Sequence, residues 1–223
     1  MKLSLRFKKE VDALAVSLTN AGLSDRYNST NLIPQHGGVE VLSVAIAAGV
    51  SASWGRDEDY VEYYERVASK GAYSLMLLDG AFIQFYYVFG GKEIISHKLA
   101  YLPSPETNRR QRRNPDAESI FADVVHNRDE LAAFRFDYDA RDKVAIDVRH
   151  PVSHFTLARC EGCRIPVSSY MSPNRFADFV LRNFYEDDFY EHEDELALEF
   201  DSPDETITRK EKNLVHFAFP CQR

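Results

Sequence analysis

The stretch 73–102 constrains the fold most, because its apolar side chains alternate with a period of two between two turn signals. Residues 73–78 run into Asp79-Gly80, a dipeptide that favours a tight hairpin, and the apolar stretch 81–89 follows. Gly90-Gly91 marks a second turn, after which residues 93–102 complete the pattern. The sequence therefore predicts a three-stranded antiparallel meander.

Amphipathic helices are expected on either side of this meander in the sequence. Apolar residues recur at spacings of four and three from residue 3 to residue 18. Residues 57–69 begin with acidic side chains, which suits the dipole at the start of a helix. A third helix is predicted after Ser172, which is a typical N-cap, and Pro173, which suits the first helical position.

The remaining segments are interpreted as loops and further strands. Polar residues and glycines at 24–38 indicate a connecting loop, whereas the apolar stretch 39–50 leaves strand and buried helix open. Further strands, expected as a second sheet under the third helix, lie at 132–139, 144–148, 152–158 and 164–167, with a final strand at 214–219.

These elements predict an α+β fold, with antiparallel β-meander sheets packed against N-terminal and C-terminal-half amphipathic helices. The length of 223 residues suits a single domain, 1–223. Within it, residues 1–53 are expected to be a helical and loop N-terminal part, and residues 186–223 an acidic C-terminal extension.

Charge and targeting signals narrow the class of protein. The 27 lysines and arginines against 35 acidic residues give a net charge of -8, which argues against nucleic-acid binding by the whole surface but allows a local basic site. The N-terminus lacks the apolar core of a secretory signal, and no apolar stretch reaches the ~20 residues of a membrane span. A cytoplasmic protein with no membrane partner is expected.

The cysteines are too few for a disulfide framework. Cys160 and Cys163 have the C-x-x-C spacing of zinc knuckles, but Cys221 is the only other cysteine. Reduced thiols beside a turn are expected, while a zinc site that adds Cys221 and a histidine stays an alternative. No cofactor and no metal are expected.

Two charged runs offer surfaces for partners. A basic run, Arg109, Arg110, Arg112 and Arg113, is interpreted as a solvated loop or as a docking patch for phosphates or an acidic partner. The acidic stretch 185–205 is interpreted as a solvated face, with nucleic-acid mimicry as the alternative. Nearby aromatics at 184–185 and 189–190 are a candidate interface.

One polar cluster carries candidate chemistry. Side chains two apart share a face of a strand, so Arg135, Asp137 and Asp139 are expected on one face and the aromatics between them on the other. Two imidazoles, an arginine for an anion and an orienting carboxylate suit metal-independent phosphodiester cleavage. The candidate catalytic residues are His150, His154 and Asp137, and the candidate substrate-binding residues are Arg135 and Arg164.

Other interpretations of the same residues remain open. A structural network in which Asp137 pairs with Arg135 or Arg164 has the same sequence pattern. A shared metal on His150 and His154 would require a chain turn at Pro151, because four residues of strand span roughly 13 Å. A nuclease site of Asp79, Glu93 and Lys98 fails on spacing, because Ile95 stands where the lysine is needed.

Several motifs, in their order along the chain, resemble a family of bacterial proteins known only as a domain of unknown function. The resemblance covers residues 54–185, and the acidic tail after Glu186 lies outside it. The motifs are Asp79-Gly80 with Gln84 and Tyr86, and residues 101–105, 134–139, 150–154, 163–167 and 179–185.

The resemblance implies a bacterial accessory protein, and with it a component of an anti-phage defence or toxin-like module that acts on nucleic acid. The strand 134–139 followed by histidines also resembles small toxins of toxin–antitoxin pairs. Two functions are therefore kept open. One is a phosphodiester-cleaving effector with His150 and His154 as base and acid. The other is a non-catalytic, partner-binding subunit of a defence or nucleic-acid-processing complex.

Overall fold

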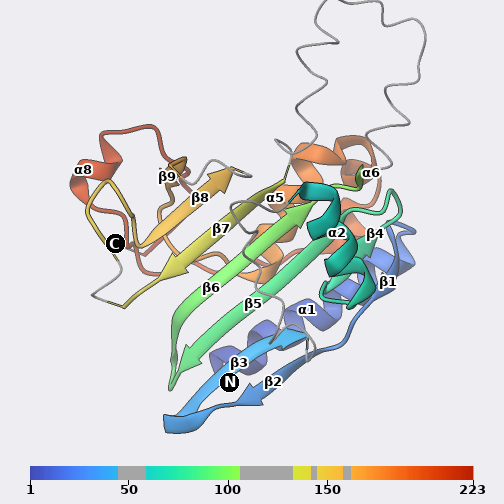
Figure 1. Ribbon diagram of the computed structural model, residues 1–223, viewed down its shortest axis with the longest axis horizontal. Helices are drawn as coiled ribbons and strands as arrows, with labels where there is room; N and C mark the ends of the chain where they lie inside the picture. The colour runs from blue at the N-terminus through green and yellow to red at the C-terminus, as the bar shows by residue number, and fades with distance from the viewer. Residues whose placement is uncertain (45–58, 106–132, 142–144, 158–161, 223) are drawn as a thin grey trace, which may run out of the picture.

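The computed structural model of the chain describes residues 1–44, 59–105, 133–141, 145–157 and 162–222, and its centre is a nine-stranded antiparallel sheet (Figure 1). The main path of the sheet runs β1-β4-β5-β6-β7-β8-β9. The β2–β3 hairpin joins this path through β5. The strands are β1 Ser24–Tyr27, β2 Thr30–Pro34, β3 Val39–Val44, β4 Leu75–Leu77, β5 Phe82–Gly90, β6 Glu93–Leu102, β7 Phe134–Asp139, β8 Ser153–Leu157 and β9 Arg164–Pro166.

Strand β5 is the branch point of the sheet. Its first residues pair with β4 and its last residues, from Tyr87 to Gly90, pair with β3, while β6 pairs along its other edge. The expected meander is confirmed. At its first turn Gly80 adopts φ +87°, where a side chain would be strained, and Ser104 would meet an added Cβ at 3.1 Å.

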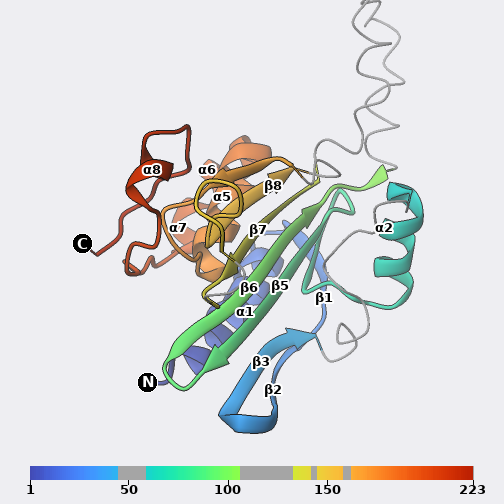
Figure 2. The ribbon, with the colours of Figure 1, turned by 60° about the vertical axis from the view of Figure 1, so that its left-hand side comes forward.

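Helices cover both faces of the sheet, but unequally (Figure 2). Helices α1 and α5 lie on one face, the inner face, and α2 lies on the other, the outer face, at one end of β5 and β6. The helices are α1 Leu3–Asn20, η1 His36–Gly38, α2 Tyr60–Ser69, α5 Pro173–Phe184, α6 Glu186–Glu191, α7 Glu193–Leu196 and α8 Arg209–Lys212. The side chain of Ser172 accepts a hydrogen bond from the Arg175 N–H, which confirms the expected N-cap of α5.

The core lies between the inner face and helices α1 and α5. Phe134 and Phe136 of β7 meet Phe176 of α5 edge to face, with ring centroids 6.3 and 6.0 Å apart. From α1, the ring of Phe7 lies 4.9 Å from that of Tyr87. Full burial of one such side chain stabilises the fold by about 2–3 kcal/mol, so this layer holds the two helices to the sheet.

Three of the sequence expectations are wrong. Residues 24–38 were expected as a loop but contain β1, which exposes three of its four side chains, and β2, whose apolar Leu32 and Ile33 are adjacent and do not alternate. The later strands continue the first sheet rather than forming a second one, because β7 pairs with β6. Of the strands expected at 144–148 and 214–219, the described residues form only isolated bridges, at Ile146 and Phe217.

The expected α+β class is confirmed. The strand pairing also determines which face of the sheet is apolar and which is polar. Aromatic side chains of β7 point to the inner face, and its charged side chains point to the outer face. Every helix in the described ranges is too short or too polar to span a lipid bilayer.

Candidate functional site

Polar side chains form two rows across the outer face of strands β6 to β9. In antiparallel strands, directly paired residues point to the same face. One row runs from Lys98 through Asp137 to His154. The next row runs from Ala100 through Arg135 and Thr156 to Arg164. The expectation that Arg135 and Asp137 share one face of their strand is therefore confirmed, and the pairing of β7 with β8 places His154 on the same face.

Asp137 is the centre of this polar face. Its Oδ2 accepts a hydrogen bond from Arg135 Nε at 2.6 Å and lies 3.5 Å from the hydroxyl of Thr156. The same oxygen lies 3.7 Å from Nε2 of His154. The residue is only 9% exposed, yet its other oxygen, Oδ1, is buried without a hydrogen-bond partner. Since buried carboxylate oxygens are nearly always hydrogen-bonded, this oxygen still lacks a donor.

His154 has a fixed tautomer. Its Nδ1 lies 2.9 Å from the carbonyl oxygen of Pro151, and a carbonyl can only accept, so Nδ1 carries the hydrogen. Burial of the ring, which is 4% exposed, lowers its pKa, although the charge of Asp137 opposes this shift. The neutral ring therefore presents a bare Nε2 toward Asp137.

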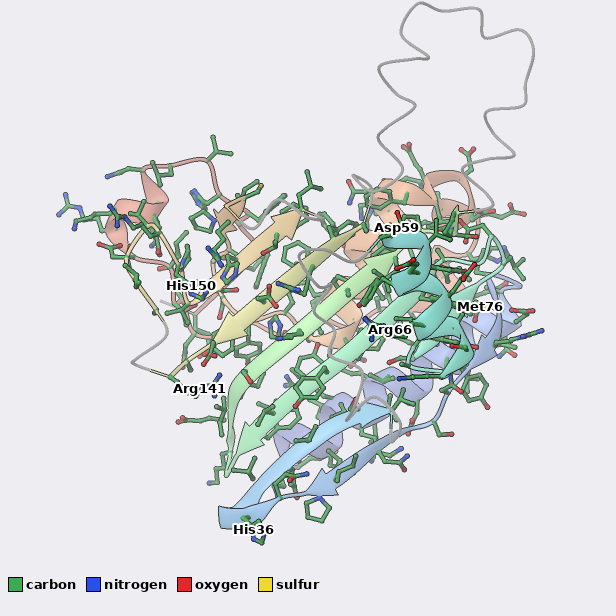
Figure 3. The ribbon with its side chains drawn as sticks, in the orientation of Figure 1. His36, Asp59, Arg66, Met76, Arg141 and His150 are labelled. Carbon is green, nitrogen blue, oxygen red and sulfur yellow. The ribbon has the colours of Figure 1, made fainter. Side chains whose placement is uncertain are left out.

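His150 lies beside His154, at the edge of the polar face. A turn brings it back to Ile146, with hydrogen bonds between their backbones in both directions. Its ring meets the His154 ring edge to face, with centroids 4.9 Å apart. Figure 3 shows His150 and Arg141 near the end of β7 and the start of β8. His150 is half-buried, and its Nδ1 has no partner among the atoms that the structure describes.

Lys98 is the member of the cluster that the sequence did not assign to it. It stands directly across from Asp137, on β6. Burial, and then the nearby charge of Arg135, lower the pKa of its ammonium group. The sequence pattern around Lys98 showed only that it points to the opposite face from Leu99. Its pairing with Asp137 depends on the register of β6 and β7.

Arg164 and Arg141 complete the rim of this face. Arg164 pairs with Thr156, which in turn pairs with Arg135. The backbones of Arg164 and Arg135 are therefore two strand spacings apart, roughly 10 Å. Arg141 pairs with the carboxylate of Asp139, lowering the pKa of that group through their hydrogen bond. Lys98, Arg135 and Arg164 thus place three cations on the face that carries the carboxylates of Asp137 and Asp139, in a chain whose net charge is -8.

The model of one protein family, described as an uncharacterized conserved protein, DUF2290, matches residues 23–219. The chain belongs to the DUF2290 family. No curated protein and no solved structure matches it significantly. The DUF2290 match reaches beyond the resemblance expected from motifs, because it includes β1 to β3 and the acidic segment after Glu186.

Some expected site residues of this DUF2290 chain lie elsewhere. The basic run of Arg109, Arg110, Arg112 and Arg113, and also Cys160, fall outside the described residues. Cys163 and Cys221 carry free thiols. Across the portions of the chain that are described, no three histidine, cysteine or acidic side chains are arranged to hold a metal ion.

The alternative trio of Asp79, Glu93 and Lys98 is not assembled. Asp79 lies in the β4–β5 turn, where its side chain accepts hydrogen bonds from the Ala81 N–H and the Tyr185 hydroxyl. Lys98 instead faces Asp137, half a strand away from Glu93 at the start of β6. The simpler interpretation of Asp79-Gly80 as a hairpin turn is confirmed.

The aromatic residues at the end of α5 and in α6 divide into buried and exposed pairs. Phe189 is buried, and the Tyr185 hydroxyl bonds Asp79 and lies 3.0 Å from the hydroxyl of Tyr101. Phe184 and Tyr190 are 45% and 53% exposed. Exposed acids of α6 and α7 adjoin them, so this corner of the DUF2290 region presents aromatic rings among carboxylates.

Proposed function

We propose that this protein is a ribonuclease that cleaves RNA phosphodiester bonds without a metal, on the polar face around Asp137. One observation carries the proposal: Asp137 Oδ1 and His150 Nδ1 are buried within the cluster without partners among the described residues. Buried polar groups are mostly hydrogen-bonded, and a binding site is one place where such groups are left for a ligand. The surrounding cations favour a phosphate as that ligand.

The nucleophile in this proposal is the 2′-hydroxyl of the RNA itself. His150 removes the proton of this hydroxyl, and its oxygen forms a bond to the adjacent phosphorus. The bond from phosphorus to the 5′-oxygen breaks, and that oxygen leaves with a proton from Lys98. The products are a 2′,3′-cyclic phosphate and a 5′-hydroxyl, so atoms and charges balance without a metal or a water molecule.

The geometry favours Lys98 over a second histidine as the acid. The rings of His150 and His154 are in contact, so a phosphate cannot lie between them as the sequence-based assignment of base and acid requires. Lys98 lies across β7 from the histidines, where it can reach the other side of a bound phosphate. Its lowered pKa makes it a stronger acid near neutral pH.

His154 and Asp137 support His150 as the base. His154 stays neutral, so it does not repel a proton on His150, and Asp137, 3.7 Å from the His154 ring, keeps a negative charge in the cluster when the imidazolium forms. Arg135 and Arg164 hold the phosphate and its developing charge. Such an activity suits an effector of an anti-phage defence or toxin-like module.

The test is a cleavage assay on a randomised single-stranded RNA pool, with EDTA and with Mg²⁺, and on DNA of the same sequences. We expect RNA fragments that end in a 2′,3′-cyclic phosphate in both conditions, and intact DNA. A defined cleaved RNA with one 2′-deoxy nucleotide at the cut should resist cleavage there. Intact RNA in both conditions, or fragments of DNA, would contradict the proposal.

The corner formed by Phe184, Tyr190 and the acidic helices favours a second function, a non-catalytic subunit that binds a basic protein partner. Large exposed aromatics beside charges are typical of binding surfaces. This function leaves the polar face structural, so wild-type protein would cut no RNA. Substitution of Phe184 and Tyr190 by serine would then abolish co-purification of the partner.

A further inference from the structure

The turn that presents His150 has an unfavourable backbone. Val148 adopts φ +70°, a left-handed conformation that strains a β-branched side chain. In the described ranges, the other residue with a positive φ that is not glycine is Ala197, which ends α7. A strained residue persists only where surrounding contacts hold it, and such contacts are often found at functional sites.

Those contacts come from α8, about 60 residues further along the chain. The Val148 N–H donates a hydrogen bond to Glu211 Oε1 at 3.2 Å. Next to it, Asp147 accepts a hydrogen bond from the Thr208 hydroxyl at 2.8 Å and forms an ion pair with Lys210 at 3.0 Å. Asp147 and Val148, which form the bend before His150, are therefore both held by the short helix α8 and its N-cap.

Glu211 is suited to hold this turn. It is only 2% exposed, and its second oxygen accepts the Thr208 N–H at 2.8 Å, within the capping box that starts α8. Each carboxylate oxygen thus binds a different backbone N–H. An amide in the same place could accept only one of these hydrogen bonds and would direct its own donor at the other N–H.

We infer that Glu211 is a positioning residue: through the strained turn at Val148, it holds the His150 ring against His154. This inference rests on the proposed function for the importance of His150, although its test does not need that activity. Without the Glu211 carboxylate, Val148 would relax to a negative φ, and the chain leading into His150 would turn away from His154.

The test uses the full chain with isotope-labelled histidines and measures the nuclear Overhauser effect between the His150 and His154 rings. We expect a clear effect in the wild type and its loss in Glu211→Gln. Glycine adopts a positive φ without strain, so Val148→Gly added to Glu211→Gln should restore the effect. Arg209→Gln, at an exposed position of the same helix, is the matched control and should change nothing.

Retention of the ring contact in Glu211→Gln would overturn the inference. So would a loss that Val148→Gly does not restore, because Glu211 would then act on the fold near α8 and not through the turn. If Glu211→Gln fails to fold, Asp147→Ala at the exposed end of the turn should weaken the same effect. If the wild type shows the ring contact but cuts no RNA, the proposed ribonuclease function is wrong, while the positioning role of Glu211 still holds.

Discussion

Nε2 of His154 and Oδ2 of Asp137 face each other at 3.7 Å, and in the neutral state neither atom carries a hydrogen. A proton can bind Nε2 between these two acceptors, because the imidazolium would then form an ion pair with the carboxylate. Burial keeps the proton away at neutral pH. The pair is therefore poised to respond to charge that develops on its neighbour, His150.

The two histidines should separate in a mutational test. His150→Ala is expected to abolish RNA cleavage with little change in melting temperature, since the ring is half-buried and its Nδ1 has no described partner. His154→Ala should lower the free energy of unfolding by about 2 kcal/mol, because it empties a buried, hydrogen-bonded site. Thermal melting and cleavage rates measure both, and His36→Ala, at an exposed histidine, is the control.

Lys98 should behave as an acid and not only as a positive charge. Lys98→Arg keeps the charge but replaces a donor of lowered pKa by a guanidinium that does not give up its proton, so the cleavage rate should fall about 100-fold while RNA affinity holds. Lys98→Ala should lower both. Lys92→Ala, on the exposed β5–β6 turn, is the control. Full activity in Lys98→Arg would assign the acid to another group.

Glu10 should make the fold less stable as pH rises. Burial raises its pKa to about 7, so the folded chain binds this proton more tightly than the unfolded chain, whose glutamate has a pKa near 4.5. The stabilisation is complete below pH 4.5 and is lost as pH rises toward 7. Glu10→Gln should therefore be more stable than the wild type at pH 8, by on the order of 2 kcal/mol. Equal unfolding free energies at pH 8 would contradict this.

His97 should have the opposite effect in acid. It lies in the core, accepts a hydrogen bond from the Met171 N–H at 3.1 Å, and has a pKa lowered to about 3 by burial. Below pH 6.5 the unfolded chain gains a proton that the folded chain refuses, so stability falls as pH drops toward 3. The unfolding free energy should lose about 1.4 kcal/mol per pH unit from this residue. Denaturant unfolding of His97→Gln at pH 6 and pH 4 should show a shallower loss.

Local patterns were sufficient where one face of an element is buried. The meander, the start of α5 at Ser172 and the opposite faces of Arg135 and Phe136 follow from alternation and capping alone. Strands β1 and β2 could not be found this way, because they are four and five residues long and neither alternates apolar with polar side chains.

The site could be predicted only in part, for a related reason. The pairing of Arg135 with Asp137 is local to one strand, so the sequence contained it. The place of Lys98 depends on the register between β6 and β7, which long-range packing sets. The hold of Glu211 on Val148 joins residues 63 positions apart, and no spacing rule reaches that far.

The inner face of the sheet is closed by two helices that lie more than 150 residues apart in the sequence, since α1 packs directly against α5. During synthesis the aromatic side chains of β5 to β7 therefore have no cover from α5 until residues 173–184 have been made. Before α5 is made, the chain exposes a large hydrophobic surface, which makes it prone to aggregation. The nascent protein is thus expected to need a chaperone until α5 leaves the ribosome.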